Sequence, residues 1–234
     1  MTSNLPWRPF HPLWLAAAAL IAGTAHAGRP LQSEDAGVLA RGDCEIEGAA
    51  LRARDAGVSA RETTLQLGCG VGASTQLAVA FGHAKAASAS ARGIELNGKT
   101  QLWHGQNEAA LALAYALASV KVSGSSWQHA ATEINLAYSR PLGNALTLHA
   151  NLGHARDEVA KQRSTTWSLA LEHAGLGAAA PMTELFGDDR SAAWWNAGLR
   201  FTAVPERFFV DASYGRQITS GSPTLWSLGF KLAF

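Results

Sequence analysis

The chain ends on Thr224-Leu225-Trp226-Ser227-Leu228-Gly229-Phe230-Lys231-Leu232-Ala233-Phe234, the stretch that decides the fold. From Trp226 onward every second residue is large and apolar, and the residues between are small or polar. Strict alternation of this kind indicates a β-strand with two unlike faces. A last strand that closes on a C-terminal aromatic residue resembles the signal read by barrel-assembly machinery. We therefore predict that this machinery is a partner and that the signal consists of Trp226, Leu228, Phe230, Leu232 and Phe234.

The same period of two runs back to Gly42, and clusters of Gly, Pro, Asn, Asp or Ser interrupt it about every 15 residues. The pattern is weakest between Gly175 and Ser191, which leaves ten strands as the alternative to twelve. The twelve predicted strands cover residues 44–54, 59–69, 75–85, 91–103, 108–121, 127–140, 145–155, 164–174, 181–187, 193–203, 207–217 and 224–234.

One face of these strands is apolar throughout, as at Leu65, Phe81, Leu96, Leu111 and Leu136. The opposite face is small or polar, and its charged residues and one histidine are the predicted lining of a lumen. These candidates are Glu95, Lys99, Glu133, His149, Glu172, Arg200, Asp211 and Lys231. A soluble β-sandwich also alternates, but in a transmembrane barrel the apolar face meets lipid and the polar face lines the interior.

Three features favour the barrel. The connections after even-numbered strands are compact, as at Pro205-Glu206, whereas most of those after odd-numbered strands, such as Val122 to Gln128, are longer. Tryptophans concentrate near strand ends, where a membrane–water boundary is expected. The third feature is the terminal strand. The predicted fold is therefore an all-β, antiparallel, up-and-down transmembrane β-barrel of about 12 strands, spanning residues 44–234.

The N-terminus predicts export. Arg8 precedes an apolar run from Leu13 to Ala22, and Ala25-His26-Ala27 supplies the small residues that a signal peptidase reads. The run is too short to span a bilayer as a helix, which needs about 20 residues. We expect a cleaved signal peptide at 1–27, a periplasmic or lumenal segment at 28–43, and localisation in the outer membrane.

Charge and cysteine content agree with an exported, lipid-embedded chain. Apart from Arg8, the sequence holds 18 basic and 18 acidic residues, a balance that argues against a nucleic-acid partner. A two-residue turn at Ala56-Gly57 pairs strand residues whose numbers sum to 113, and Cys44 and Cys69 satisfy this sum. We therefore predict a disulfide between them in an oxidising compartment.

Arg29-Pro30-Leu31-Gln32-Ser33-Glu34-Asp35-Ala36-Gly37 resembles the opening of the outer-membrane family named for the MetA pathway of phenol degradation. That opening reads Arg-Pro-Leu-x-Thr-Asp-Asp-Ala-Gly, so Ser33 and Glu34 are mild departures. Gly42 and Glu47 follow at the matching spacing, and Leu228 to Phe234 also looks like the family's ending. The resemblance implies a porin-like barrel suggested to pass hydrophobic or aromatic compounds.

The leading functional hypothesis is a passive channel for small solutes, with outer-membrane lipid and a small-molecule solute as partners. Both signs of charge appear among the lumen candidates, so strong charge selectivity is not expected, and their pairing into a plug is an equal alternative. Separately, if the polar segment from Arg29 to Asp43 folds into the lumen as a short plug, its acidic pair Glu34-Asp35 would meet lumenal Arg or Lys. The sequence leaves the oligomeric state open.

The competing class is an outer-membrane lipid hydrolase or deacylase with Ser and His. The histidines of this chain are scattered along the sequence, and no Gly-x-Ser-x-Gly elbow occurs. We therefore do not expect an enzyme. His83 and His154 fall on the apolar parity, near loop ends, where a lipid-cleaving site would be placed. Zinc spacing and nucleotide-binding motifs are also missing, so no metal and no cofactor are expected. A structural barrel without transport is a third alternative.

Overall fold

The computed structural model describes residues 30–87, 89–173, 176–219, 221 and 223–234. The predicted signal peptide, residues 1–27, lies outside the described residues. Within the described part the secondary structure consists of strands joined by short connections, and no helix there is long and apolar enough to cross a membrane.

Twelve strands follow one another along the described chain, as predicted. They are β1 (Cys44–Asp55), β2 (Val58–Gly72), β3 (Thr75–Ala86), β4 (Ala89–His104), β5 (Ala110–Val122), β6 (Gln128–Leu142), β7 (Leu146–Asp157), β8 (Gln162–His173), β9 (Ala179–Asp188), β10 (Trp194–Val204), β11 (Phe208–Gln217) and β12 (Thr224–Ala233). The stretch between Gly175 and Ser191, where the alternation is weakest, contains β9. The barrel therefore has twelve strands and not ten.

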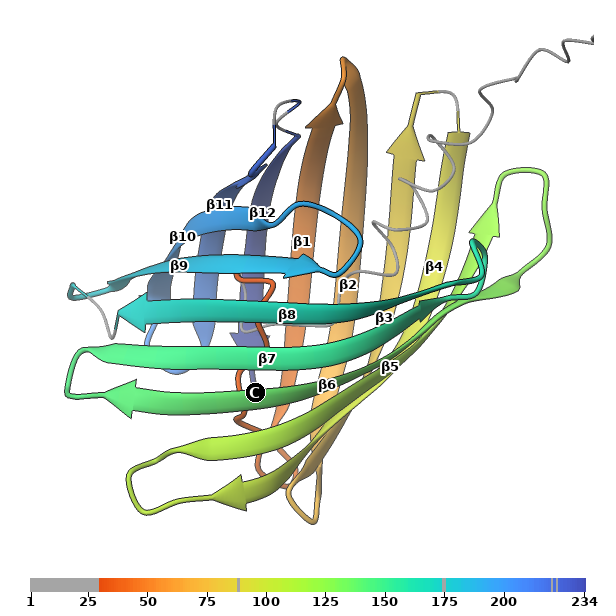
Figure 1. Cartoon of the computed structure of the whole chain (residues 1–234). Helices are drawn as coiled ribbons and strands as arrows, with labels where there is room; N and C mark the ends of the chain where they lie inside the picture. Colours follow the sequence, from red (N-terminus) through yellow and green to blue (C-terminus); the bar gives the residue numbers. More distant parts are fainter. Residues whose placement is uncertain (1–29, 88, 174–175, 220, 222) are drawn as a thin grey trace, which may run out of the picture.

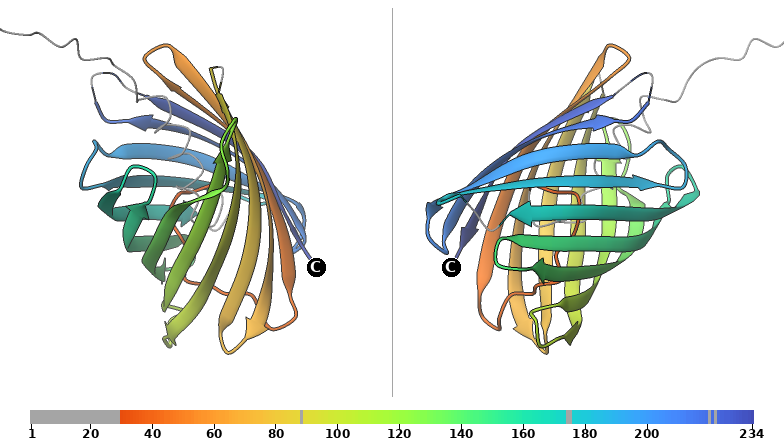
Figure 2. Two further views of the ribbon diagram at one scale, coloured as in Figure 1. Left: turned by 90° about the vertical axis from the view of Figure 1, so that its right-hand side faces the viewer. Right: turned by 60° about the vertical axis from the view of Figure 1, so that its left-hand side comes forward.

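The strands form one closed antiparallel barrel in which each strand pairs with its neighbours in sequence and β1 pairs with β12 (Figures 1 and 2). The seam is continued by the last residue, because the Phe234 amide donates to the Cys44 carbonyl at 2.9 Å and the Cys44 amide donates to the Phe234 carbonyl at 2.8 Å. Closure leaves no unpaired sheet edge, which is the condition for crossing lipid with strands.

The first hairpin has the predicted register. Ala56 and Gly57 both have positive φ, of 44° and 83°, which suits a two-residue turn between antiparallel strands. Cys44 pairs with Cys69, their Cα atoms are 4.1 Å apart, and a disulfide joins them. The predicted disulfide is therefore confirmed.

Large apolar side chains cover the outside of the barrel. Leu96 is 60% exposed, Leu228 63%, Leu136 40% and Phe230 37%, although all four lie in regular strands. The buried residues of the strands are instead mostly alanines and polar groups. A soluble sandwich would bury the leucines, so the outward apolar face identifies a transmembrane barrel.

The connections differ from the predicted alternation of short and long. β3 ends at Ala86 and β4 begins at Ala89, so this odd-numbered connection is as compact as the even-numbered ones. The connection between the predicted strands 145–155 and 164–174 is shorter than expected, because β7 continues to Asp157 and β8 begins at Gln162. The strands of these two hairpins therefore run farther than the sequence predicted.

We expect the apolar outer face to show the depth dependence of a lipid-exposed surface. Leu96→Arg, in the middle of β4, should lower the free energy of unfolding in phospholipid vesicles by about 2–4 kcal/mol. Leu102→Arg, near the end of the same strand, is the matched control and should cost about 0–1 kcal/mol. Urea unfolding measures both, and equal losses would contradict the assignment of the lipid face.

Candidate functional site

Residues 30–43, here called the plug, run through the interior of the barrel (the orange-red segment in Figure 1). Leu31, Ser33, Glu34 and Ala36 are buried, with Ser33 only 1% and Ala36 0% exposed. Sequence analysis left the segment 28–43 either in the periplasm or in the lumen, and of its described residues Leu31 and Ala36 pack against inward residues of the strands. The site is therefore built between the plug and the inward faces of the strands.

Glu184 of β9 holds the start of the plug. Its carboxylate accepts hydrogen bonds from the Gln32 amide at 2.7 Å, the Ser33 amide at 2.9 Å and the Ser33 hydroxyl at 2.7 Å. Asn196 of β10 donates its side-chain amide to the same carboxylate at 2.8 Å. Hydrogen bonds to a charged acceptor are the stronger kind, so Glu184 is a firm anchor.

Apolar contacts seat the plug on two sides. Leu31 packs against Ala170 and Met182, and Ala36 packs against Ala110 and Ala112. The inward face of β5 is made of small residues, which leaves room for the plug backbone to lie against it. Its members are Ala110, Ala112, Ala114, Ala116 and Ala118.

The middle of the plug is held through its backbone. Asn151 of β7 accepts from the Glu34 amide at 2.6 Å and donates to the Glu34 carbonyl at 2.9 Å, as a neighbouring strand would. The Ser139 hydroxyl of β6 accepts from the Ala36 amide at 2.8 Å. These partners satisfy backbone groups that would otherwise be buried without a hydrogen bond.

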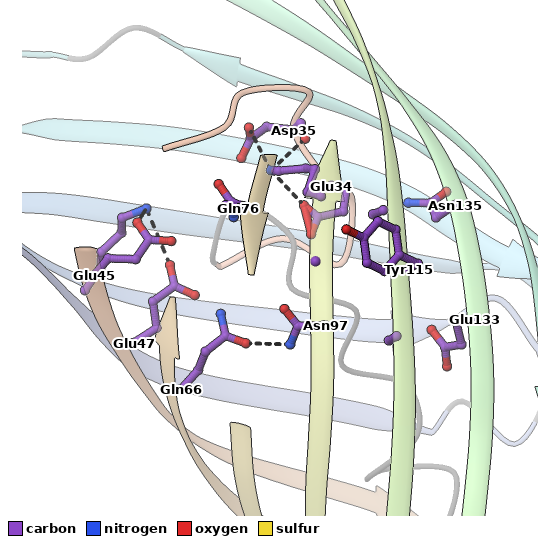
Figure 3. A pocket seen from close by; sticks show the side chains of 15 residues that line it. Glu34, Asp35, Glu45, Glu47, Gln66, Gln76, Asn97, Tyr115, Glu133 and Asn135 are labelled. Atoms are coloured by element: carbon purple, nitrogen blue, oxygen red, sulfur yellow. Dashed lines mark hydrogen bonds and ion pairs between the residues drawn. The ribbon is translucent and has the colours of Figure 1, made fainter. Parts of the chain in front are cut away.

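Lys99 of β4 contacts both acidic residues of the plug, Glu34 and Asp35, which are labelled in Figure 3. Its ammonium nitrogen is 3.3 Å from a Glu34 oxygen, 3.2 Å from an Asp35 carboxylate oxygen and 3.0 Å from the Asp35 carbonyl. This is the contact that the sequence suggested for a lumenal segment. Burial raises the pKa of Glu34 to about 8. Burial would also raise the pKa of Asp35, but Lys99 and His149 lower it to about 2.

The other lumen candidates fall into separate groups. Glu172 lies 3.1 Å from Arg200 and 3.7 Å from the Nε2 of His149. Lys231 contacts two residues that the sequence analysis did not select, Glu45 and Glu47 (Figure 3).

Glu95 accepts from Asn97 at 3.1 Å, Glu133 lines the interior cavities, and Asp211 is buried on β11. The eight candidates do not form one cluster.

Acidic side chains outnumber basic ones on the inward faces of the described strands. The acidic residues include Glu45, Glu47, Glu62, Glu95, Glu133, Glu172, Glu184 and Asp211, against Lys99, Arg200 and Lys231. The expectation of weak charge selectivity rested on a candidate set in which both signs were nearly balanced, and it omitted Glu45, Glu47, Glu62 and Glu184. Their inward parity was readable from the sequence.

The plug divides the interior unequally. Beside Lys99, Glu34 and Lys231 the free space is about 40 Å³, enough for little more than one or two water molecules. On the side of the connections β7–β8 and β9–β10 lies a wider cavity of about 420 Å³, here called the vestibule. Gln32 of the plug, Glu133, Thr166, Ser168, Phe186 and Trp194 contribute to its lining.

Trp194 differs from the expectation that the tryptophans lie at the membrane–water boundary. It contributes to the vestibule and stacks on Phe186, with ring centroids 6.1 Å apart and an interplanar angle of 15°. The next residue, Trp195, contacts Tyr214, which in turn contacts Trp226. Adjacent residues of one strand point to opposite sides, so the Trp194-Trp195 pair puts one indole on each face.

Over residues 16–234 the sequence matches one family model, described as "Uncharacterised conserved protein UCP029691". No curated protein matches the chain in sequence. The fold is similar to that of the COG4313 outer membrane channel from Pseudomonas putida F1, with a TM-score of 0.69 and 10% identity over 86% of this chain and 98% of that one.

Two further solved structures are similar. The KdgM porin gives a TM-score of 0.61 with 10% identity over 81% of this chain and 99% of that one. The NanC porin gives 0.57 with 9% identity over 80% and 98%. At these identities the likeness concerns the fold, and it agrees with the closed barrel described above.

Glu184 is expected to control the order of the plug. Glu184→Ala removes the acceptor of the Gln32 and Ser33 amides, so hydrogen exchange in a peptide covering the plug should accelerate at least about tenfold. Mass spectrometry of the refolded chain measures this rate. Glu133→Ala is the matched control, because Glu133 also faces the interior beside the plug but makes no hydrogen bond to the described plug residues. An unchanged rate of hydrogen exchange in Glu184→Ala would show that other contacts hold the plug in place.

Proposed function

Since this chain belongs to the family described as "Uncharacterised conserved protein UCP029691" and forms a closed barrel with an apolar exterior, we propose that it is an outer-membrane channel. It passes small solutes without chemical change, and the plug sets the width of its lumen. The observation that carries the proposal is the vestibule of about 420 Å³, which is lined by polar side chains and has the plug residue Gln32 in its wall.

The proposed location and orientation follow from the same features. The signal peptide 1–27 takes the chain across the inner membrane, and the terminal strand from Trp226 to Phe234 presents it to the barrel-assembly machinery. Both termini of the barrel then face the periplasm, and the β1–β2 and β3–β4 connections face the cell exterior. The names of the similar structures, two porins and an outer membrane channel, support this proposal.

The solute class is proposed from the lining. Excess acidic groups disfavour anions, which makes neutral or cationic solutes the better fit. The stacked Phe186 and Trp194 offer an aromatic surface inside the vestibule, which supports a solute with a ring. This agrees with the resemblance of Arg29–Gly37 to the phenol-degradation family. One solved structure of similar fold is described as the KdgM porin in complex with disordered oligogalacturonate, so that porin has been observed with a solute.

One arrangement speaks for the hydrolase alternative. The Ser139 hydroxyl is 2.8 Å from the Nδ1 of His149, whose Nε2 lies 3.7 Å from Glu172, an order similar to a catalytic triad. However, Ser139 holds the Ala36 amide and Glu172 pairs with Arg200. We therefore assign this group to plug anchoring. Labelling of Ser139 by a serine-directed phosphonate would favour the hydrolase instead.

The channel proposal is tested by single-channel conductance in planar bilayers. The wild-type barrel should conduct weakly, and deletion of residues 30–36 should raise conductance about twofold or more because the plug no longer fills the lumen. Lys161→Gln, in an exposed connection, should leave conductance unchanged. Circular dichroism confirms that each variant is folded. Absence of conductance in the folded deletion variant would refute the channel.

Charge selectivity is expected to favour cations. In a potassium chloride gradient the reversal potential should show a preference for potassium over chloride, since acidic groups dominate the lining. Glu133→Gln should weaken that preference, because Glu133 lines both the narrow cavity and the vestibule. Glu206→Gln, in the connection before β11, is the control and should change nothing. Preference for chloride would contradict the proposed lining.

A further inference from the structure

A second charged surface lies on the outside of the barrel. Arg52, Arg61, Lys85, Arg92 and Lys121, here called the basic rim, belong to β1–β5, which form one continuous wall (Figure 1). Each has the outward parity. The residues on either side of Arg61, Lys85 and Arg92 in their strands are buried, as Ala60 and Glu62 are beside Arg61. Arg52 and Lys121 lie directly opposite Arg61 and Arg92 and therefore point to the same side. Arg61, Lys85, Arg92 and Lys121 are exposed, and Arg52 is half-buried.

Strand register brings these cations together. Arg52 lies directly opposite Arg61, and Arg61 lies directly opposite Lys85. In the adjacent row Arg92 lies opposite Lys121 and also opposite His83. Like charges in directly opposed positions repel each other and destabilise a sheet. Three strand pairs, β1–β2, β2–β3 and β4–β5, have this arrangement, and an anion bound between the cations would relieve the repulsion.

In the described part of the chain, no acidic side chain forms an ion pair with any of the five. Arg52 donates its Nε to the Ser59 hydroxyl at 3.2 Å, a neutral partner. The acidic neighbours in sequence, such as Glu62 and Glu95, have the inward parity. The rim therefore carries several positive charges on the outer surface of the barrel.

The rim adjoins the apolar outer band. Arg61 follows the outward parity of Leu65, Lys85 that of Phe81, and Arg92 that of Ile94, each two to four residues farther toward the β1–β2 or β3–β4 connection. A ligand that contacts both zones must combine acyl chains with an anionic head. This favours a lipid over a soluble anion or a nucleic acid, neither of which would cover Leu65 and Phe81.

We propose that the basic rim binds the phosphate groups of the anionic glycolipid that forms the outer leaflet of the outer membrane. This inference rests on the proposed location, which turns the rim toward that leaflet. Arginine binds phosphate in a planar, bidentate manner, and lysine adds a point charge. Adjacent strands lie about 4.8 Å apart, so side chains from two or three strands reach one phosphate group. Lipid bound in this way screens the repulsion within the rim.

The test titrates the refolded mature chain, in nonionic detergent, with lipid A that carries two phosphates. Arg61→Gln/Arg92→Gln should bind at least about tenfold more weakly than wild type, since each basic residue near an anionic lipid surface contributes about fivefold. The matched control is Arg140→Gln/Arg207→Gln, two exposed arginines near the opposite end of the barrel, and its binding should be unchanged. Arg61→Lys/Arg92→Lys keeps the charge and should retain most of the binding.

Two further probes identify the recognised group. Dephosphorylated lipid A should bind wild type as weakly as the glutamine variant, and inorganic phosphate should compete only poorly. Equal binding of dephosphorylated lipid A, equal binding by the glutamine variant, or tight binding of inorganic phosphate would each overturn the proposal. Circular dichroism shows that the variants are folded. A barrel that binds lipid A without conducting ions refutes the channel alone, and one that conducts without binding refutes the rim alone.

Discussion

The closure of β1 on β12 is the constraint on which the structure depends. Lipid offers no hydrogen-bond partners, so every strand must find two neighbours, and the last strand must return to the first. The paired backbone groups of Cys44 and Phe234 complete this seam at one end. Once the ring is closed, each side chain has only two destinations, the lipid or the lumen. The outer apolar band and the inner polar lining are consequences of that choice.

The interior differs from a simple tube because part of the chain returns to fill it. The plug is held as an additional, irregular strand would be, through backbone contacts with Asn151 and Ser139 and through Glu184 at its start. Glu34 and Asp35 of the plug both contact Lys99, beside the smaller of the two cavities. The vestibule lies beside it, so in the proposed orientation a solute entering from the exterior would meet the plug before the periplasm.

Sequence analysis predicted most of the fold because the alternation of apolar and polar residues is local. Within each strand, this alternation alone shows which side chains face lipid. The register of Cys44 and Cys69 could be counted from a two-residue turn for the same reason. The position of the plug could not be derived in this way, since its main contact joins Ser33 to Glu184, 151 residues away. The inward position of Trp194 was readable from parity, but the tryptophans were considered only as boundary residues.

The alanine column of β5 has a consequence for how such a barrel can change. Its inward side chains are methyl groups where the plug lies, whereas Leu111, Leu113 and Leu117 point outward and give the strand an apolar surface toward the acyl chains. Enlarging one alanine would displace the plug without altering the surface that lipid meets. The two sides of a single strand can thus be modified independently. Substitutions at the inward alanines of β5 would change the width of the lumen in small steps and leave the lipid-facing surface unchanged.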